Sequence, residues 1–179
     1  MKIIFICTKS VTFNTFLKSQ AEYFVKRGFK VLVACSDSEK LNFKNDLTYK
    51  INFPKTIIEL FNVFNYFKIF IQIRKLVNEN SSGIYYLHTP LASHLFRFFN
   101  YFNKIKIIYF VHGFRFLLTT KSLKNFFFKI IEKILSYKTH IFITINNHDF
   151  NFAKLNLTNK KLCYKVNGVG LNLSSKHFK

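Results

Sequence analysis

Two polar segments of the chain each place a histidine close to a residue that turns the backbone. His88 lies shortly before Pro90, and His112 comes directly before Gly113. An imidazole can hydrogen-bond a sugar hydroxyl or support the charge that develops in a transition state. The plainer interpretations are an ordinary helix start at Pro90 and a tight turn at Gly113. Both histidines are therefore candidates for chemistry, and their neighbours are candidates for binding.

Three of those neighbours suit contact with a substrate. Thr89 follows His88, and Phe114 and Arg115 follow Gly113. The Arg115 guanidinium has the charge and geometry to bind a phosphate. The alternative is that Phe114 only anchors the turn.

Two further polar segments supply weaker candidates for binding. Residues 8–13 include Thr12 and Phe13, and the amides and hydroxyls of such a loop can hold a phosphate or a sugar at a helix N-terminus. A plain connecting loop explains this segment equally well. It lacks the glycines of a dinucleotide fingerprint, so we expect no NAD or FAD. Asn146 and Asp149 are candidates for substrate binding, although they suit a helix cap better than catalysis.

Alternating strands and helices must position these segments. Apolar runs predict strands at 2–7, 30–35, 48–53, 84–88, 106–111, 140–145 and 162–166. Helical patterns lie between them, at 14–26, 57–78, after Pro90, at 122–137 and at 147–154. This alternation predicts one domain over residues 1–179, an α/β, Rossmann-like, doubly wound parallel sheet with helices on both faces. Ligands bind beyond the carboxyl ends of such strands, where the four polar segments lie.

Three of the predicted helices have a polar stripe at helical spacing. The stripe in 57–78 excludes a membrane-spanning helix there. The helix after Pro90 has polar residues at Ser93, Arg97, Asn100 and Lys104. The helix at 122–137 has Ser122, Asn125, Lys129, Glu132 and Ser136 beside Phe126, Phe127, Ile130 and Ile134. The apolar face of this last helix either packs on the sheet, which we favour, or lies on anionic lipid.

The composition indicates the compartment and the class of partner. The net charge is +20, which favours an anionic partner, but there is no nucleic-acid-binding motif, so we expect no nucleic acid. Cys7, Cys35 and Cys163 are few and widely spaced, which suits small core residues in a reducing compartment rather than disulfides. The N-terminus has no signal-peptide pattern. We therefore expect a cytoplasmic protein.

The order of these features resembles the N-terminal domain of family 4 glycosyltransferases, in the branch that builds bacterial capsule, exopolysaccharide and O-antigen. Four motifs carry the resemblance along essentially the whole chain: H-T-P-x-A-S at 88–93, V-H-G-F-x-F at 111–116, I-T-x-N-x-x-D at 143–149, and G-V-G followed by a hydrophobic residue and Asn at 168–172. One departure is the loop at 9–13, which lacks the glycine pair of many members.

The resemblance implies one half of a GT-B enzyme. This half binds the acceptor, often a lipid-linked sugar at the inner face of the cell membrane, and His112 is the catalytic candidate, with His88 second. Transfer proceeds with retention and without an obligatory metal or other cofactor. The nucleotide-sugar donor is a co-substrate bound mainly by a second domain, whose E-x7-E motif does not occur before Lys179. Three interpretations are open: a truncated gene product, a fragment, or one subunit of a split enzyme with a donor-domain partner chain. The alternative is a non-catalytic, membrane-associated module that recruits another subunit.

Overall fold

A seven-stranded parallel sheet forms the centre of the protein. The computed structural model describes residues 1–43, 47–54, 59, 62–114, 122–157 and 162–168. The strands are β1 (Lys2–Ile6), β2 (Lys30–Cys35), β3 (Thr48–Lys50), β4 (Ile84–Leu87), β5 (Lys106–Val111), β6 (Ile141–Thr144) and β7 (Leu162–Lys165). Their order is β3-β2-β1-β4-β5-β6-β7, and every adjacent pair is parallel. The predicted doubly wound, Rossmann-like fold is thus confirmed.

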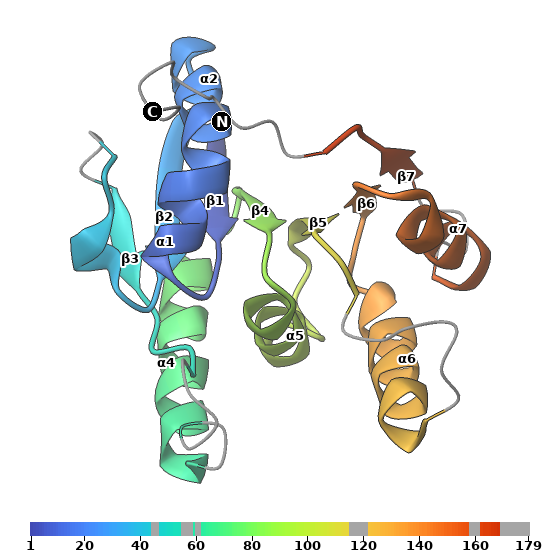
Figure 1. Ribbon diagram of the computed structural model, residues 1–179. Helices are drawn as coiled ribbons and strands as arrows, with labels where there is room; N and C mark the ends of the chain where they lie inside the picture. Colours follow the sequence, from blue (N-terminus) through green and yellow to red (C-terminus); the bar gives the residue numbers. More distant parts are fainter. Residues whose placement is uncertain (44–46, 55–58, 60–61, 115–121, 158–161, 169–179) are drawn as a thin grey trace, which may run out of the picture.

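Helices cover the two faces of this sheet unequally (Figure 1). The first helical segment lies on one side and comprises α1 (Ser10–Thr12), a wider π-type turn η1 (Phe13–Leu17) and α2 (Lys18–Lys26). On the other side lie α4 (Val63–Glu79), α5 (Pro90–Phe99), α6 (Leu123–Ser136) and α7 (Asn147–Asn156). A short 3-10 turn, η2 (Ser38–Lys40), connects β2 towards β3.

The sheet separates two hydrophobic cores because side chains alternate along each strand. On the α1–α2 side, Phe5 and Phe110 pack with Phe13 and Leu17. On the other side, Ile4 and Tyr109 belong to a larger core that includes residues of α4, α5 and α7. Cys7 and Cys35 are free and buried on the α1–α2 side, as expected for small core residues.

Several element boundaries differ from the sequence predictions. The first helical segment begins at Ser10 instead of residue 14, because the turn starts directly after the β1 loop. The third strand ends at Lys50, and a Phe53-to-Ile51 backbone hydrogen bond of 2.7 Å turns the chain before Pro54. α4 begins at Val63, where the Asn62 side chain accepts from the Asn65 N–H. Residues 57, 58, 60 and 61 of the predicted helix lie outside the described part.

Polar residues of α5 and α6 meet in a buried contact between the two helices. Ser93, Arg97 and Asn100 of α5 are completely buried, and Glu132 of α6 is 1% exposed. Arg97 Nη2 donates to Glu132 Oε2 at 2.9 Å, and His94 Nε2 lies 2.7 Å from Glu132 Oε1. This pairing satisfies charges that would otherwise be buried alone.

As a result, the favoured prediction for helix 122–137, that its apolar face packs on the sheet, is wrong. Phe126 and Phe127 are 64% and 62% exposed. Phe128 and Leu135, on the opposite side of α6, are the residues that pack inwards. The sequence pattern misled because Glu132 has its partner on a different helix.

Candidate functional site

The site begins where the strand order reverses, between β1 and β4. β1 and β4 are neighbours in the sheet, but their following helices lie on opposite faces, so the loops after them diverge. Thr8 and Thr89, the residues just beyond these strands, join the two loops. The Thr89 hydroxyl accepts from the Thr8 N–H at 2.8 Å, and the two hydroxyls are 2.7 Å apart. Thr89, a predicted binding residue, therefore has at least part of its hydrogen-bonding capacity committed to holding the loops.

The loop after β1 is fixed by residues at the end of β2. Asp37 Oδ1 accepts from the Ser10 N–H at 2.7 Å, and the Ser36 N–H donates to the Thr8 carbonyl at 3.1 Å. The carboxylate of Asp37 thus occupies the position near the start of α1 where an anionic ligand was considered. The turn η2, which follows Asp37, has no side-chain cap of its own. Only the fold brings Asp37 to Ser10.

His88 and His112 meet at the ends of β4 and β5. His88 Nδ1 lies 3.3 Å from His112 Nε2, a hydrogen bond in which one ring donates and the other accepts. Alternation along the strands places both rings on the α1–α2 side of the sheet. There His88 stacks on Phe5 with a 5.4 Å centroid separation and on Phe110 with 5.6 Å. The two predicted histidines therefore form one unit.

Burial gives the two histidines different roles. His88 is completely buried, and its Nε2 has no hydrogen-bond partner within the described residues. His112 is half-buried at the edge of the pair. The prediction that His88 contacts a substrate is therefore corrected, since its ring is completely buried.

The same burial keeps both rings neutral. Burial, together with the nearby His112, holds the pKa of His88 well below its ordinary range. Burial also lowers the pKa of His112. Neutral imidazole has one donor and one acceptor nitrogen, so the pair leaves His112 Nδ1 as the nitrogen that can meet a substrate.

Gly113 allows close approach beside His112. Its φ of +146° is a conformation that other residues rarely adopt, and apart from its chain neighbours no atom of the described residues lies within 4 Å of the position that a Cβ would take. The predicted sharp turn is confirmed. Phe114 is half-buried and packs against Tyr109 and Phe152, with ring centroids 6.5 and 5.4 Å away. Arg115 lies outside the described residues.

The remaining predicted binding residues have structural contacts. Phe13 is completely buried in the core, so its predicted contact with substrate is corrected to a packing role, whereas Thr12 is half-buried in α1. The Asn146 side chain accepts from the Asp149 N–H at 2.8 Å and donates to the Asp149 carboxylate at 2.8 Å. The cap that the sequence favoured for Asn146 and Asp149 is thus confirmed, and substrate binding by them stays a prediction.

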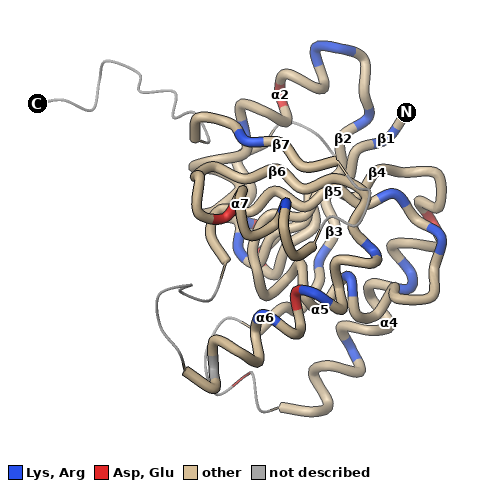
Figure 2. Tube along the Cα trace, turned by 90° about the vertical axis from the view of Figure 1, so that its right-hand side faces the viewer, with Lys and Arg blue, Asp and Glu red and all other residues tan. Residues whose placement is uncertain are grey.

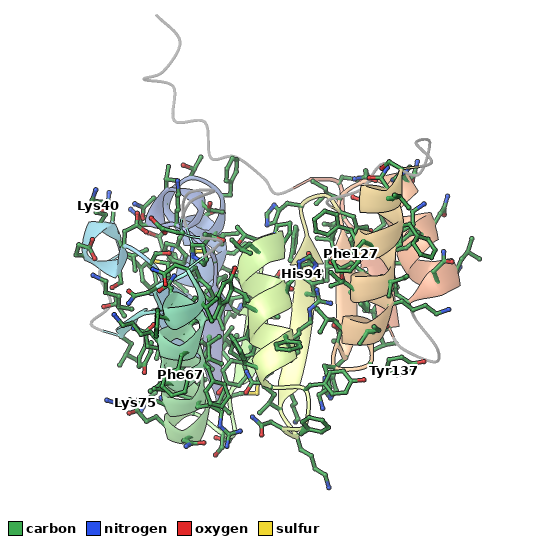
Figure 3. All side chains as sticks on the ribbon, turned by 90° about the horizontal axis from the view of Figure 1, so that it is seen from below. Lys40, Phe67, Lys75, His94, Phe127 and Tyr137 are labelled. Atoms are coloured by element: carbon green, nitrogen blue, oxygen red, sulfur yellow. The ribbon has the colours of Figure 1, made fainter. Side chains whose placement is uncertain are left out.

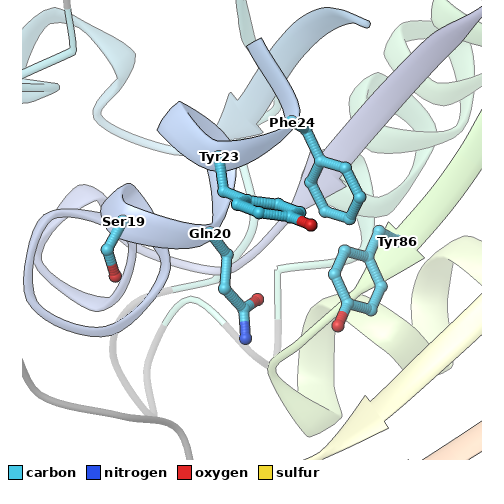
Figure 4. A pocket seen from close by; sticks show the side chains of 5 residues that line it. All are labelled: Ser19, Gln20, Tyr23, Phe24 and Tyr86. Atoms are coloured by element: carbon cyan, nitrogen blue, oxygen red, sulfur yellow. The ribbon is translucent and has the colours of Figure 1, made fainter. Parts of the chain in front are cut away.

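A cavity of about 340 Å³ opens on the same side of the sheet as the histidine pair. Ser19, Gln20, Tyr23 and Phe24 of α2 line it together with Tyr86 of β4 (Figure 4). The Tyr86 ring lies 4.3 Å from the His88 ring, centroid to centroid. The Tyr86 ring therefore lines the cavity and also contacts the buried ring of His88.

Comparisons with known proteins connect this geometry to a family. A family model described as glycosyl transferase 4-like matches residues 2–146. A relative named "Putative glycosyltransferase EpsD", from Bacillus subtilis (strain 168), is 26% identical over 174 residues. That alignment covers 96% of this chain and 44% of EpsD, so the chain spans less than half the length of this relative.

Solved structures share the fold at low sequence identity. Sucrose-phosphate synthase from Thermosynechococcus elongatus has a TM-score of 0.68 and 7% identity, over 93% of this chain and 47% of that one. UDP-N-acetylglucosamine 2-epimerase from Rickettsia bellii has a TM-score of 0.61 and 14% identity, over 92% and 44%. Since a synthase and an epimerase share the fold, these likenesses show architecture only. The family match over residues 2–146 is the decisive comparison, and by it the chain belongs to the glycosyl transferase 4-like family.

Proposed function

We propose that the chain is the acceptor-side half of a retaining GT-B glycosyltransferase of bacterial surface-polysaccharide biosynthesis. The enzyme transfers a sugar from a nucleotide-sugar donor to a lipid-linked saccharide, and this half binds that saccharide. The observation that carries the proposal is the family match over residues 2–146, which includes His112 and Gly113 at the end of β5. The donor is held mainly by a second domain or a partner chain, and transfer needs no metal or other cofactor.

In this proposal His112 acts as a neutral hydrogen-bonding group. Its lowered pKa keeps it uncharged near neutral pH, so it can accept a proton from, or donate one to, a sugar hydroxyl in the transition state. His88, 3.3 Å away and completely buried, fixes the tautomer and orientation of the His112 ring. The open backbone at Gly113 admits the sugar beside that ring.

A second candidate function is a non-catalytic, membrane-associated module that recruits another subunit. The outward-facing phenylalanines of α6 suit it, because an exposed apolar helix face fits attachment to a membrane or to another subunit. None of the helices in the described part of the chain is both long and apolar enough to cross a bilayer. In this second proposal the association is peripheral, at the inner face of the cell membrane.

The leading proposal is tested by measuring sugar transfer with histidine variants of the full-length natural protein. The assay follows labelled sugar from nucleotide-sugars into a lipid extract. We expect His112→Ala to lower kcat by about 10²- to 10⁴-fold, the range for a positioned acid–base group. His140→Gln is the matched control. His140 directly precedes β6 and so lies at the amino ends of the strands, whereas His112 lies at their carboxyl ends. Equal activity of His112→Ala and wild type would remove His112 from the mechanism, and absence of transfer in every form would favour the recruiting module.

A further inference from the structure

The outer side of α6 carries a continuous apolar stripe. It consists of Leu123, Phe126, Phe127, Ile130, Ile134 and Tyr137, which are 89%, 64%, 62%, 39%, 49% and 61% exposed. These positions recur every three or four residues, so they form one line about 21 Å long. Soluble proteins rarely leave so many large apolar side chains together in water. We call this line the α6 stripe.

A second apolar group lies on the same side of the molecule. Val63, Phe64, Phe67 and Ile71 of α4 are 76%, 84%, 65% and 50% exposed. Figure 3 shows Phe67 of α4 on one side of α5 and Phe127 and Tyr137 of α6 on the other. We call these four residues the α4 group.

Basic residues accompany both apolar surfaces, and acidic ones are scarce. α4 contains Lys68, Arg74 and Lys75 against Glu79. Glu132 is the sole carboxylate in the sequence of α6, and it is buried against Arg97. Figure 2 shows basic positions recurring along these helices, with few acidic ones. Protein interfaces are depleted in lysine, whereas interfacial helices combine aromatic residues with lysine.

The buried charges fix which side of α6 faces out. Arg97 and His94 hold Glu132 towards α5, which places the α6 stripe about half a turn away from that contact. α6 is thus locked with its apolar side outward.

Chain direction places the starts of α4 and α6 at the same end of the strands as the candidate site. Helices between parallel strands run back from the carboxyl ends of the strands, so α4 and α6 both start at the edge where β5 ends in His112. Val63, Phe64 and Leu123, the most exposed apolar residues of the two helices, lie at those starts.

We propose that the α6 stripe and the α4 group form a docking surface that inserts into the headgroup region of an anionic lipid bilayer. Insertion brings the carboxyl edge of the sheet to the lipid surface. The surface exists whether or not the proposed transfer takes place. Only its purpose, the capture of a lipid-linked acceptor, rests on the proposed function.

Flotation of the full chain with vesicles tests the surface separately from transfer. We expect binding to vesicles that contain phosphatidylglycerol at low ionic strength, and weaker binding to pure phosphatidylcholine or at high salt. F126S/F127S should lower the partition coefficient at least about tenfold. The matched control is Y23S/V25S on α2, which lies on the other side of the sheet, where Tyr23 and Val25 are 54% and 43% exposed. This control should bind as wild type does.

A fluorescence experiment decides the matter even if F126S/F127S fails to fold. The chain has no tryptophan, so Phe127→Trp and Tyr23→Trp are single reporters. The proposal predicts a blue shift on adding anionic vesicles for Phe127→Trp alone. No vesicle binding by wild type, an equal response of both reporters, or self-association that F126S/F127S abolishes without any vesicle binding would each overturn the proposal.

Discussion

The buried contact between α5 and α6 gives a sharp prediction for Glu132→Gln. Arg97 is completely buried, and its main anionic partner is Glu132, at 2.9 Å. At an effective dielectric constant near 20, a pair at this distance gains about 6 kcal/mol before desolvation is subtracted. Removing one member of a buried pair typically costs about 3–5 kcal/mol, because the other charge is left buried. We expect Glu132→Gln to lose about this much unfolding free energy.

Urea denaturation followed by far-ultraviolet circular dichroism measures this loss. Glu79→Gln is the control, because Glu79 pairs with Lys75 at 3.9 Å on the surface, and such exposed pairs contribute at most about 1 kcal/mol. The double variant Arg97→Met/Glu132→Leu should recover most of the stability, since it leaves no buried charge. If Glu132→Gln costs no more than Glu79→Gln, the charges do not hold α6 in place.

The same pair predicts how stability depends on pH. Burial acts to raise the pKa of Glu132, but Arg97 and the hydrogen bonds from His94 and Arg97 outweigh it, and the net pKa is lowered. The stabilisation is therefore complete above about pH 4.5, the unfolded value, and is lost as the pH falls through the folded pKa. Glu132→Gln should show a smaller loss on the acid side in urea titrations. An unchanged acid profile in Glu132→Gln would contradict this assignment.

Two further predictions concern the histidine pair, and a third concerns its neighbour Gly113. Because the folded-state pKa of His88 is lowered, the stability that its neutral ring contributes is fully present above about pH 6.5 and decreases as the pH falls below that value. His88→Phe should flatten this decrease in urea titrations. In the transfer assay, His88→Phe should lower kcat at least about tenfold, while His88→Asn, which retains a nitrogen facing His112, should recover part of it. Gly113→Ala should cost about 1–3 kcal/mol of unfolding free energy, because alanine rarely adopts the φ of +146° found there. An unchanged melting temperature for Gly113→Ala would show that the backbone there relaxes.

Most of the fold could be predicted because each strand is a local signal. β2 and β5 were predicted to the residue, since apolar runs buried on both faces stand out from polar loops. The long-range features could not be predicted in this way. The contact of Asp37 with Ser10 spans 27 residues, and that of Arg97 with Glu132 spans 35. A single sequence contains no signal for such pairs, so the buried contact between polar residues of α5 and α6 was not predicted.

The candidate site was predictable to a similar degree. Strand ends identified His88 and His112, because parallel strands bring their carboxyl ends to one edge. Their relative burial was not predictable, since it depends on Phe5 and Phe110 from neighbouring strands stacking on His88. Phe13 was misassigned for a related reason: a loop position was read as exposed, but its ring packs edge-on against Phe5.

The orientation of α6 connects the core of the protein with its site. A polar contact, Arg97 with Glu132, holds the helix, and so the apolar side that would ordinarily drive packing is left for another surface. A lipid-linked acceptor has its sugars outside the bilayer and its chain within it. A protein that lies on the bilayer through the starts of α4 and α6 would turn the carboxyl ends of its strands, where His112 lies, towards those sugars, with the His112 ring on the other face of the sheet from these helices. On this proposal, the buried pair of Arg97 and Glu132 serves to keep the phenylalanines of α6 facing outward, although its desolvation costs free energy.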